Sequence, residues 1–311
     1  MTSPAPTRTY GLPMAFDALG DRWSILTLRA VYDGHHTFTE LRDSVGITDG
    51  VLAARLARLT GSGMLDRLQY HARPPRWQYH RSDIAVELWQ AGIALWLWDQ
   101  AWDSPSLDTQ IRHVACGNIA APAFGCASCG TLGVTTHDVQ ATVADGLPDE
   151  LNLSSATRTV RLAALPYVDA VTLLGDHWST AMLAVTLFGA RSFSEYRAVL
   201  QRISTATLSE RLRLFVVSGL LETAPGNGGR RKVYRMTQKS RDFFPVFAAM
   251  NEWAGRFADD TGLRFEHVHC GSELIPRFWC DHCHRVMDGP NTTFETIAPT
   301  VADPAQSRPN A

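Results

Sequence analysis

Apolar residues recur at helical spacing in three short stretches near the start of the chain. Trp23, Leu26 and Ala30 lie three and four residues apart, as on one face of a helix. A second one-sided apolar stripe runs through residues 38–45, and a third runs through residues 52–59, after a turn at Gly46. Three short helices with a tight turn between the last two are typical of a helix-turn-helix.

A β-hairpin is predicted directly after the third helix. Residues 64–68 and 77–80 are its strands, and residues 72–76 are its tip. A helix-turn-helix followed by such a hairpin is a winged helix. A long amphipathic helix then carries the large side chains Trp89, Leu95, Trp98 and Trp102. Two interpretations of these side chains stay open, because they fit either the core of the domain or an interface between domains.

The whole pattern occurs twice. Leu-Gly-Asp-Arg-Trp-Ser at residues 19–24 returns as Leu-Gly-Asp-His-Trp-Ser at residues 174–179, which is 155 residues later. Trp98 and Trp253 keep the same offset. A period this long indicates a duplicated domain and not a solenoid. Positions kept in both copies are therefore the first place to look for function.

The length of 311 residues is typical of two domains. We predict an α+β, mostly helical fold with two winged helix-turn-helix domains in tandem, each followed by a small zinc-ribbon-like module. The predicted segments are a flexible arm (1–12), winged helix 1 (13–112), module 1 (113–135), a linker (136–160), winged helix 2 (161–264), module 2 (265–290) and a disordered tail (291–311).

The composition is that of a globular protein, with 45% hydrophobic and 19% charged residues. The net charge of −2 excludes a polycation but leaves room for a small basic face. No apolar run reaches the roughly 18 residues of a membrane span, and the first residues lack the features of a secretory signal. We expect a cytoplasmic protein without membrane contact, in which six cysteines are more often metal ligands or thiols than disulfides.

Cysteine and histidine residues form a second repeated pattern. His113-x-x-Cys116 precedes Cys126-x-x-Cys129, and the whole set returns 154 residues later. Three thiolates and one imidazole make a closed tetrahedral site that suits structural zinc. The predicted ligands of two such sites, one in each module, are His113, Cys116, Cys126 and Cys129, and His267, Cys270, Cys280 and Cys283. Free thiols or a redox pair remain the alternative, and the two histidines are the weaker ligands because surface or capping histidines are common.

Both predicted hairpins are basic. Residues 67–81 hold four arginines and no acidic residue, and residues 224–235 hold four basic residues and no acidic one. Such a wing supplies charge to DNA phosphates, and the start of the recognition helix usually reaches the base edges. The candidate contacts with double-stranded DNA are Thr48, Arg55, Arg58, Arg73, Arg76, Ser204, Thr205, Thr207, Arg211, Arg230, Arg231 and Lys232. Two alternatives stay open: the wing residues solvate a loop, and Arg55 and Arg211 brace the domain by pairing with a carboxylate.

The residues quoted above resemble a known family. Leu-Gly-Asp-Arg-Trp-Ser, then Phe-Thr-Glu-Leu-Arg at residues 38–42, then Val-Leu-x-x-Arg-Leu at residues 51–56, resemble the HxlR family of bacterial transcriptional regulators. The resemblance covers roughly residues 10–103 and 165–257. It implies sequence-specific DNA binding as a homodimer. In some members a cysteine lies 13 residues before the tryptophan and senses electrophiles; here Tyr10 and Leu165 stand there, so that switch is absent.

The predicted function is transcription regulation through a pseudo-symmetric DNA site. The two domains pair within one chain, or the chain forms a homodimer. Motifs for a phosphate-binding loop, a nucleophile elbow or a zinc protease do not occur, so we expect no enzyme activity. Two alternatives remain, namely a protein-binding adaptor of the transcription machinery and a metal or thiol sensor that uses the cysteine clusters as its switch.

Overall fold

The first half of the chain begins with four helices. The computed structural model describes residues 10–19, 21–102, 109–151, 170–226 and 232–296. The helices are α1 (Gly11–Leu19), α2 (Arg22–Tyr32), α3 (Phe38–Val45) and α4 (Asp49–Gly61). Asp21 caps α2 by accepting hydrogen bonds from two backbone amides, and a capping box between Thr37 and Glu40 starts α3. Gly46 ends α3 with a positive φ of 70° and turns the chain toward α4.

A hairpin and two helices complete the first winged helix. Strand β1 (Leu65–Ala72) pairs antiparallel with β2 (Pro75–Arg81), so the strands reach further than predicted and only Arg73 and Pro74 lie between them. The short helix α5 (Asp83–Glu87) leads into the long helix α6 (Trp89–Trp102). Leu41, Leu52 and Leu56 are buried in the core of this domain. The predicted helix-turn-helix with a wing is confirmed.

The second half repeats the same order. Its elements are α8 (Ala170–Leu174), α9 (His177–Leu187), α10 (Phe193–Val199), α11 (Thr205–Val217), β7 (Leu221–Pro225), β8 (Lys232–Met236), α12 (Gln238–Arg241) and α13 (Phe244–Ala254). Asp176 caps α9 as Asp21 caps α2, and a capping box between Ser192 and Glu195 starts α10. Two winged helices in tandem, within a fold of mixed helix and strand, are therefore confirmed.

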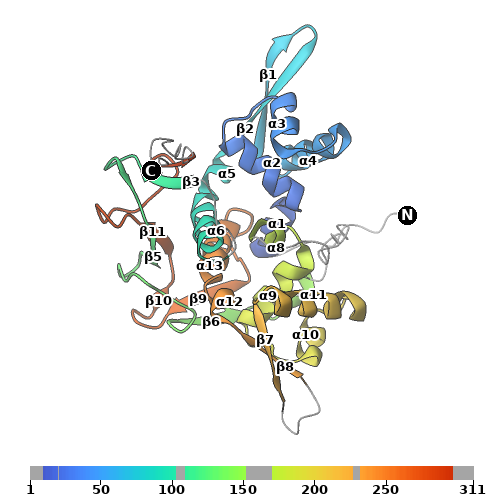
Figure 1. Ribbon diagram of the computed structural model, residues 1–311, viewed down its shortest axis with the longest axis vertical. Helices are drawn as coiled ribbons and strands as arrows, with labels where there is room; N and C mark the ends of the chain where they lie inside the picture. The colour runs from blue at the N-terminus through green and yellow to red at the C-terminus, as the bar shows by residue number, and fades with distance from the viewer. Residues whose placement is uncertain (1–9, 20, 103–108, 152–169, 227–231, 297–311) are drawn as a thin grey trace, which may run out of the picture.

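The long helices α6 and α13 pack against each other at the centre of the molecule (Figure 1). Each sends a tryptophan into the opposite half. The indole N–H of Trp98 donates to the carbonyl oxygen of Lys239 at 2.8 Å, and that of Trp253 donates to the carbonyl oxygen of Ile84, also at 2.8 Å. These two bonds are equivalent under the repeat. The large aromatics on these helices thus serve the contact between the halves, which was one of the two interpretations of the sequence.

A glycine of the repeated motif also lies at this contact. A Cβ atom at Gly175 would lie 2.4 Å from the backbone nitrogen of Arg22, so no larger residue fits without moving the backbone of the other half. Helix α8 packs against α2 and α6 at the same place. The repeated Leu-Gly-Asp sequence therefore combines a helix cap with close approach between the halves.

The strands that follow each winged helix pair across the two halves. The first half supplies β3 (Thr109–His113), β4 (Asn118–Ile119), β5 (Ala123–Cys126), β6 (Val139–Val143) and helix α7 (Leu147–Leu151), and the second supplies β9 (Leu263–His267), β10 (Ser272–Glu273), β11 (Pro276–Trp279) and β12 (Thr292–Thr296). Strand β12 pairs with β3, β6 pairs with β9, and β5 pairs with β11, all antiparallel. The expectation of two separate modules is wrong, because each half completes the sheets of the other. We call this joint structure the shared extension.

The register identifies where the two halves meet. Phe124 of β5 pairs with Phe278 of β11, which is its own repeat partner, and their ring centroids lie 5.4 Å apart. Pairing of a residue with its own equivalent places these rings at the pseudo-twofold centre of the shared extension.

Three predicted boundaries are corrected by these strands and helices. The arm predicted over residues 1–12 ends earlier, because Gly11 and Leu12 are buried in α1. The linker predicted over residues 136–160 contains β6 and α7, and the tail predicted over residues 291–311 begins with β12. Pairing of β6 and β12 with strands of the other half accounts for the difference, because the local composition does not reveal such pairing. Residues 1–9, 152–169 and 297–311 lie outside the described part of the chain.

Figure 1 shows the arrangement of these parts. The β1–β2 and β7–β8 hairpins lie at opposite ends of the long axis, and helices α4 and α11 lie on the same side of the paired helices α6 and α13. The strands β3, β5 and β11 of the shared extension lie on the other side. Among the described helices, none is both long and apolar enough to cross a membrane.

Candidate nucleic-acid interface and metal centres

The start of each recognition helix presents small polar side chains to solvent. Thr48 is the N-cap of α4, is exposed and makes no capping bond with its side chain. Ser204 is the exposed N-cap of α11; its hydroxyl accepts from the amide of Thr207 and lies 2.8 Å from the Thr207 hydroxyl. Thr205 is exposed and accepts a hydrogen bond from Arg197 at 3.3 Å. All four residues can reach a groove of DNA when the helix docks by its N-terminus.

Two predicted DNA contacts are internal ion pairs instead. The side chain of Arg211 is fully buried, and its Nε donates to the Asp176 carboxylate at 2.8 Å. Arg55 makes the equivalent bond to Asp21 at 2.8 Å, with 26% of its side chain exposed. The prediction that Arg211 touches DNA is wrong, because its guanidinium lies in the core. The alternative interpretation, in which these arginines brace the domain through a carboxylate, is the one that the structure supports.

The side chain of Arg58, a third predicted DNA contact, also makes hydrogen bonds within the domain. Its Nε and one terminal nitrogen donate to the carbonyl oxygen of Asp17 at 3.1 and 2.6 Å, which ties α4 to α1. The sequence interpretation overlooked Arg213, which is exposed on α11 in line with Thr205 and Ser209. A spacing of four residues between these exposed positions would have revealed them as one helix face.

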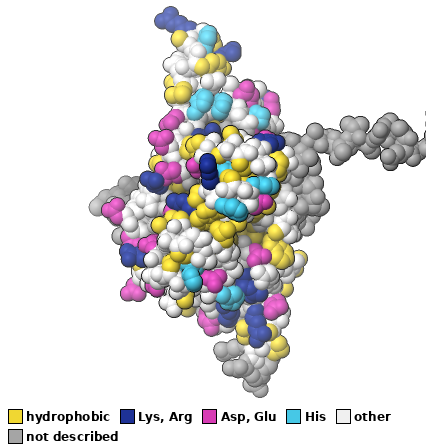
Figure 2. Space-filling view, turned by 90° about the vertical axis from the view of Figure 1, so that its left-hand side faces the viewer, with side chains coloured by type: hydrophobic (Ala, Val, Ile, Leu, Met, Phe, Trp, Pro, Cys, Tyr) yellow, Lys and Arg dark blue, Asp and Glu magenta, His cyan; other side chains and the backbone are white. Residues whose placement is uncertain are grey.

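The wing residues meet the expectation of an exposed basic hairpin. Arg73 and Arg76 are exposed at the end of the β1–β2 hairpin, where Figure 2 shows Lys and Arg side chains at the upper tip. Arg67, further down the same hairpin, stacks over the Trp77 ring with 4.0 Å between the guanidinium carbon and the ring centroid. Lys232 is exposed at the start of β8, whereas Arg230 and Arg231 lie outside the described residues.

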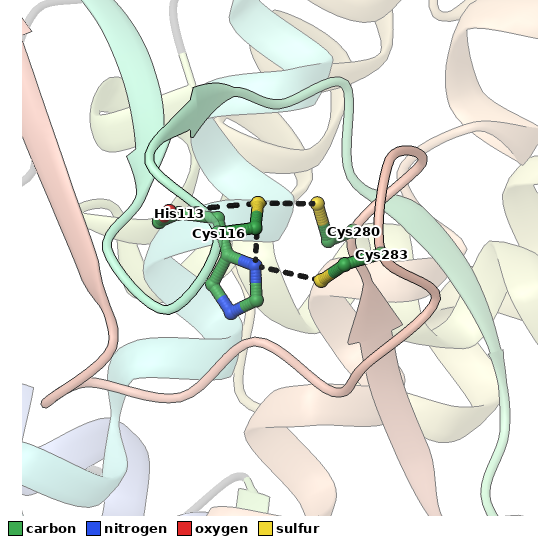
Figure 3. A group of neighbouring side chains, drawn as sticks. All are labelled: His113, Cys116, Cys280 and Cys283. Atoms are coloured by element: carbon green, nitrogen blue, oxygen red, sulfur yellow. Dashed lines mark hydrogen bonds between the residues drawn. The ribbon is translucent and has the colours of Figure 1, made fainter.

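The first cluster of potential metal ligands joins both halves of the chain (Figure 3). It consists of His113 at the end of β3, Cys116 in the turn after it, and Cys280 and Cys283 after β11. Nδ1 of His113 lies 3.5 Å from the Cys116 sulfur and 3.2 Å from the Cys283 sulfur, and the sulfurs of Cys116 and Cys280 are 3.8 Å apart.

The second cluster is the pseudo-symmetric counterpart. It joins Cys126 and Cys129, at and after the end of β5, to His267 and Cys270, at and after the end of β9. Nδ1 of His267 lies 3.4 Å from the sulfurs of both Cys129 and Cys270. Hydrogen bonds from Thr131, first from its hydroxyl and then from its backbone amide, lower the pKa of Cys129 to about 6. A thiol with such a pKa is largely thiolate at neutral pH, which is the form that binds a metal.

All eight predicted ligands are thus brought into two clusters, but the expected grouping is wrong. The sequence pattern grouped His113 and Cys116 with Cys126 and Cys129, within one half. In the structure the histidine-containing pair of one half meets the later cysteine pair of the other half. The strand exchange causes this, because β5 and β11 run side by side and carry their following cysteines across the centre.

Both clusters fit a tetrahedral zinc ion. In each, the four ligand atoms lie within 4.8 Å of one another. A tetrahedral zinc ion with Zn–S bonds of about 2.3 Å separates its sulfurs by about 3.8 Å, which matches Cys116 and Cys280. The Asn118 backbone amide lowers the pKa of Cys116 to about 6, whereas burial raises the pKa of Cys280. Ionisation of neighbouring thiols together is unfavourable because the two thiolates repel each other. A bound divalent cation would stabilise both thiolates.

A comparison with protein families assigns the winged helices. The model of the HxlR-like helix-turn-helix matches residues 18–106 and again residues 173–261, which together make up more than half of the chain. The chain belongs to the HxlR-like helix-turn-helix family. Each matched range ends before the cysteines and the histidine of its own half, so all eight candidate ligands lie outside the part that matches the HxlR-like family.

Curated relatives of this HxlR-like chain are similar in sequence. An uncharacterized HTH-type transcriptional regulator of Mycobacterium bovis is 31% identical over 120 residues, which cover 37% of this chain and 75% of the relative. YtfH of Escherichia coli is 32% identical over 25% of this chain and 62% of its own length, and YvaP of Bacillus subtilis is 29% identical over 30% of this chain and 88% of its own. Both are named HTH-type transcriptional regulators. No solved structure matches this chain.

Proposed function

We propose that this protein is a DNA-binding transcriptional regulator whose two winged helices read the two halves of one operator from a single chain. The observation that carries the proposal is the crosswise contact of α6 and α13, in which Trp98 and Trp253 each bond to the opposite half. Winged helices that bind as dimers face two half-sites of DNA related by a twofold axis. Here the repeat supplies both domains.

The polar residues at the helix starts are the proposed readers of the bases. Thr48 would reach one half-site, and Ser204, Thr205 and Thr207 the other. The two helices present different surfaces, since Ser209 and Arg213 of α11 correspond to Ala53 and Ala57 of α4. Because serine and arginine hydrogen-bond to base edges, whereas alanine offers only an apolar contact such as that with a thymine methyl group, the two half-sites should differ in sequence.

The basic wings are the proposed contacts with phosphates. Arg73 and Arg76 lie in the hairpin at one end of the molecule, and Lys232 lies in the hairpin at the other end. Arg230 and Arg231 directly precede Lys232 in the sequence and are proposed to act with it. Contacts with phosphates position the protein on DNA and contribute affinity without sequence preference. Arg55, Arg58 and Arg211 are left out of the proposed interface because they make internal bonds.

Two zinc ions are proposed to cross-link the two halves of the chain in the shared extension. His113, Cys116, Cys280 and Cys283 would hold one ion, and Cys126, Cys129, His267 and Cys270 would hold the other. Zinc with four protein ligands supplies cross-linking and no open position for a reaction. Since each ion would bind both halves, metal binding would fix the distance between the two winged helices.

The test is binding of the full chain to DNA from the region upstream of its own gene, over a series of salt concentrations. The wild type should outcompete random DNA. The variant Arg73→Ala/Arg76→Ala should bind more weakly at all sequences. The slope of log K against log salt should become shallower by about 0.9 for each DNA phosphate that the variant no longer neutralises.

A matched control is Arg264→Ala, which removes a positive charge from the exposed face of β9 in the shared extension. Its affinity and salt slope should equal those of the wild type. If the metal-loaded wild type prefers no DNA fragment, and neutral wings change nothing, the regulator proposal fails and a protein-binding adaptor takes its place.

A further inference from the structure

The two halves differ at one place in the shared extension. Beside the first winged helix, Phe294 of β12, a strand that the second half supplies, packs its ring against Trp89 and Trp96, with centroid distances of 5.1 and 6.2 Å. Tyr32 adds a fourth ring, 6.3 Å from Trp89. The four aromatic side chains fill the space between the sheet, the long helix α6 and the end of α2.

The equivalent residues beside the second winged helix are smaller. The strand registers give the correspondence, because Phe294 pairs with Ile111 as Ala141 pairs with Phe265. Ala141 of β6, a strand that the first half supplies, therefore takes beside the second winged helix the place that Phe294 takes beside the first. Leu187 stands for Tyr32 and Phe244 for Trp89. Only Phe265, in the place of Ile111, is larger than its counterpart, and its ring packs edge-on against Phe244 at 5.3 Å.

A groove of about 320 Å³ lies where the ring is missing. Its walls are the β6 side chains Val139, Ala141 and Val143, the end of α9 from Leu187 to Gly189, and the rings of Phe244 and Phe265; Thr136 completes the lining. Ala141 itself is exposed, so the groove opens to solvent. Its lining carries no charged side chain among the described residues.

We propose that this groove binds a small neutral aromatic molecule. The class of occupant follows from the equivalent position beside the first winged helix, which the phenyl ring of Phe294 fills between equivalent elements. A groove of this volume is at the small end of ligand pockets, which are mostly apolar with few polar groups. A charged ligand would lose its hydration without gaining a partner of opposite charge in the lining.

The groove lies against the second winged helix. Leu187 ends α9, whose first residues are held to the recognition helix by the Asp176–Arg211 pair. Shortly after the groove wall, the carbonyl oxygen of Arg191 accepts a hydrogen bond from the Tyr234 amide of the wing at 2.7 Å. A ligand in the groove would therefore contact the second winged helix directly and would change its affinity for DNA. This regulatory part rests on the proposed function.

The test measures binding of N-phenyl-1-naphthylamine, a neutral fluorescent aromatic probe, to the full chain. The wild type should bind one probe per chain with saturation. Ala141→Phe, which copies the ring that Phe294 provides beside the first winged helix, should abolish binding, and Leu187→Tyr, which copies Tyr32, should weaken it. A thermal unfolding transition like that of the wild type shows that a variant is folded. Because two independent variants are measured, the test still decides if one of them fails to fold.

The matched control removes the ring at the equivalent position beside the first winged helix. Phe294→Ala should create a second groove and raise the stoichiometry to two probes per chain. The proposal is overturned if the wild type shows no saturable binding, if both filled variants bind as well as the wild type, or if Phe294→Ala still binds one probe.

A DNA-binding measurement with saturating probe tests the regulatory part separately. The probe should change the DNA affinity of the wild type but not that of Ala141→Phe. If the probe binds and DNA affinity stays constant, the regulatory part fails and the ligand site stands. If the protein binds no DNA at all, the proposed function fails, while the fluorescence result remains independent of it.

Discussion

Arg55 and Arg211 occupy equivalent positions in the two recognition helices, but their surroundings differ. Each is bonded to the aspartate that caps the helix behind it, so one carboxylate both starts a helix and anchors the recognition helix. Repetition of both partners marked them as important from the sequence. It did not identify the partner or the role, because an arginine kept in two copies suits DNA and an internal ion pair equally well.

We expect Arg211→Ala to destabilise the protein strongly. Removing one partner of a buried ion pair leaves the other charge uncompensated, at a cost of about 3–5 kcal/mol. Arg55→Ala should cost less, because Arg55 is partly exposed and water can solvate the remaining Asp21. Urea unfolding of both variants measures the difference. Equal losses of unfolding free energy would contradict this account of burial.

At the scale of elements, helices and wings follow from local sequence but the strand exchange does not. Helical periodicity, capping residues and the two hairpins predicted both winged helices. The repeat also predicted all eight residues of the two candidate metal-binding clusters. It could not say which copy of a ligand meets which, since equivalent residues from either half satisfy the same spacing. The pairing of β5 with β11 determines which ligands meet. This pairing depends on contacts between residues at least 150 positions apart in the sequence.

The crossed grouping of ligands makes a sharp prediction for metal content. His113→Ala/Cys283→Ser removes two ligands of one cluster and should leave one zinc per chain. His113→Ala/Cys126→Ser removes one ligand from each cluster and should leave the chain with weakly held or no zinc. Grouping within each half predicts the reverse for the second variant, namely one remaining ion. Metal analysis of the purified proteins distinguishes the two.

The capping boxes of α3 and α10 predict a response to acid. Backbone amides of Thr37 and Arg191 donate to Glu40 and Glu195, respectively, and lower the pKa of each carboxyl below its usual 4.5. A lowered pKa means that the stabilisation is present above pH 4.5 and is lost as the pH falls through the lowered value. Amide chemical shifts at Ser192 and Arg191 should follow this titration.

Glu195→Gln is the control for that response, because glutamine also completes a capping box but does not titrate. The amide shifts of residues 191 and 192 should then stay constant through the acid range. If they still move in the variant as in the wild type, another group controls the start of α10.

At the scale of the whole molecule, the duplication has placed two winged helices with different exposed residues on α4 and α11 in one chain. The sequence predicted pairing of the domains within one chain as one of two possibilities. The large aromatics could not decide between them, since the same tryptophans would serve an interface between two chains. Their bonds to Ile84 and Lys239 of the opposite half are properties of the folded chain.

The difference between α4 and α11 predicts that each half-site depends on its own residues. Thr205→Ala should weaken binding only to operators with an intact second half-site. Thr48→Ala should do so for the first, at a cost of about 1–3 kcal/mol where the side chain reads a base. Binding to operators mutated in one half at a time provides the measurement. If both variants respond identically to every operator, the two helices do not read separate halves.

Joining both halves in one chain also changes what a single mutation does during evolution. In a protein made of two identical chains, every substitution appears on both sides, so an improvement at one half-site must be tolerated at the other. Here Ala141 and Phe294 differ at equivalent positions, and so do the exposed residues of α4 and α11. One half of the molecule can therefore acquire a new specificity while the other preserves the old one, without a second gene.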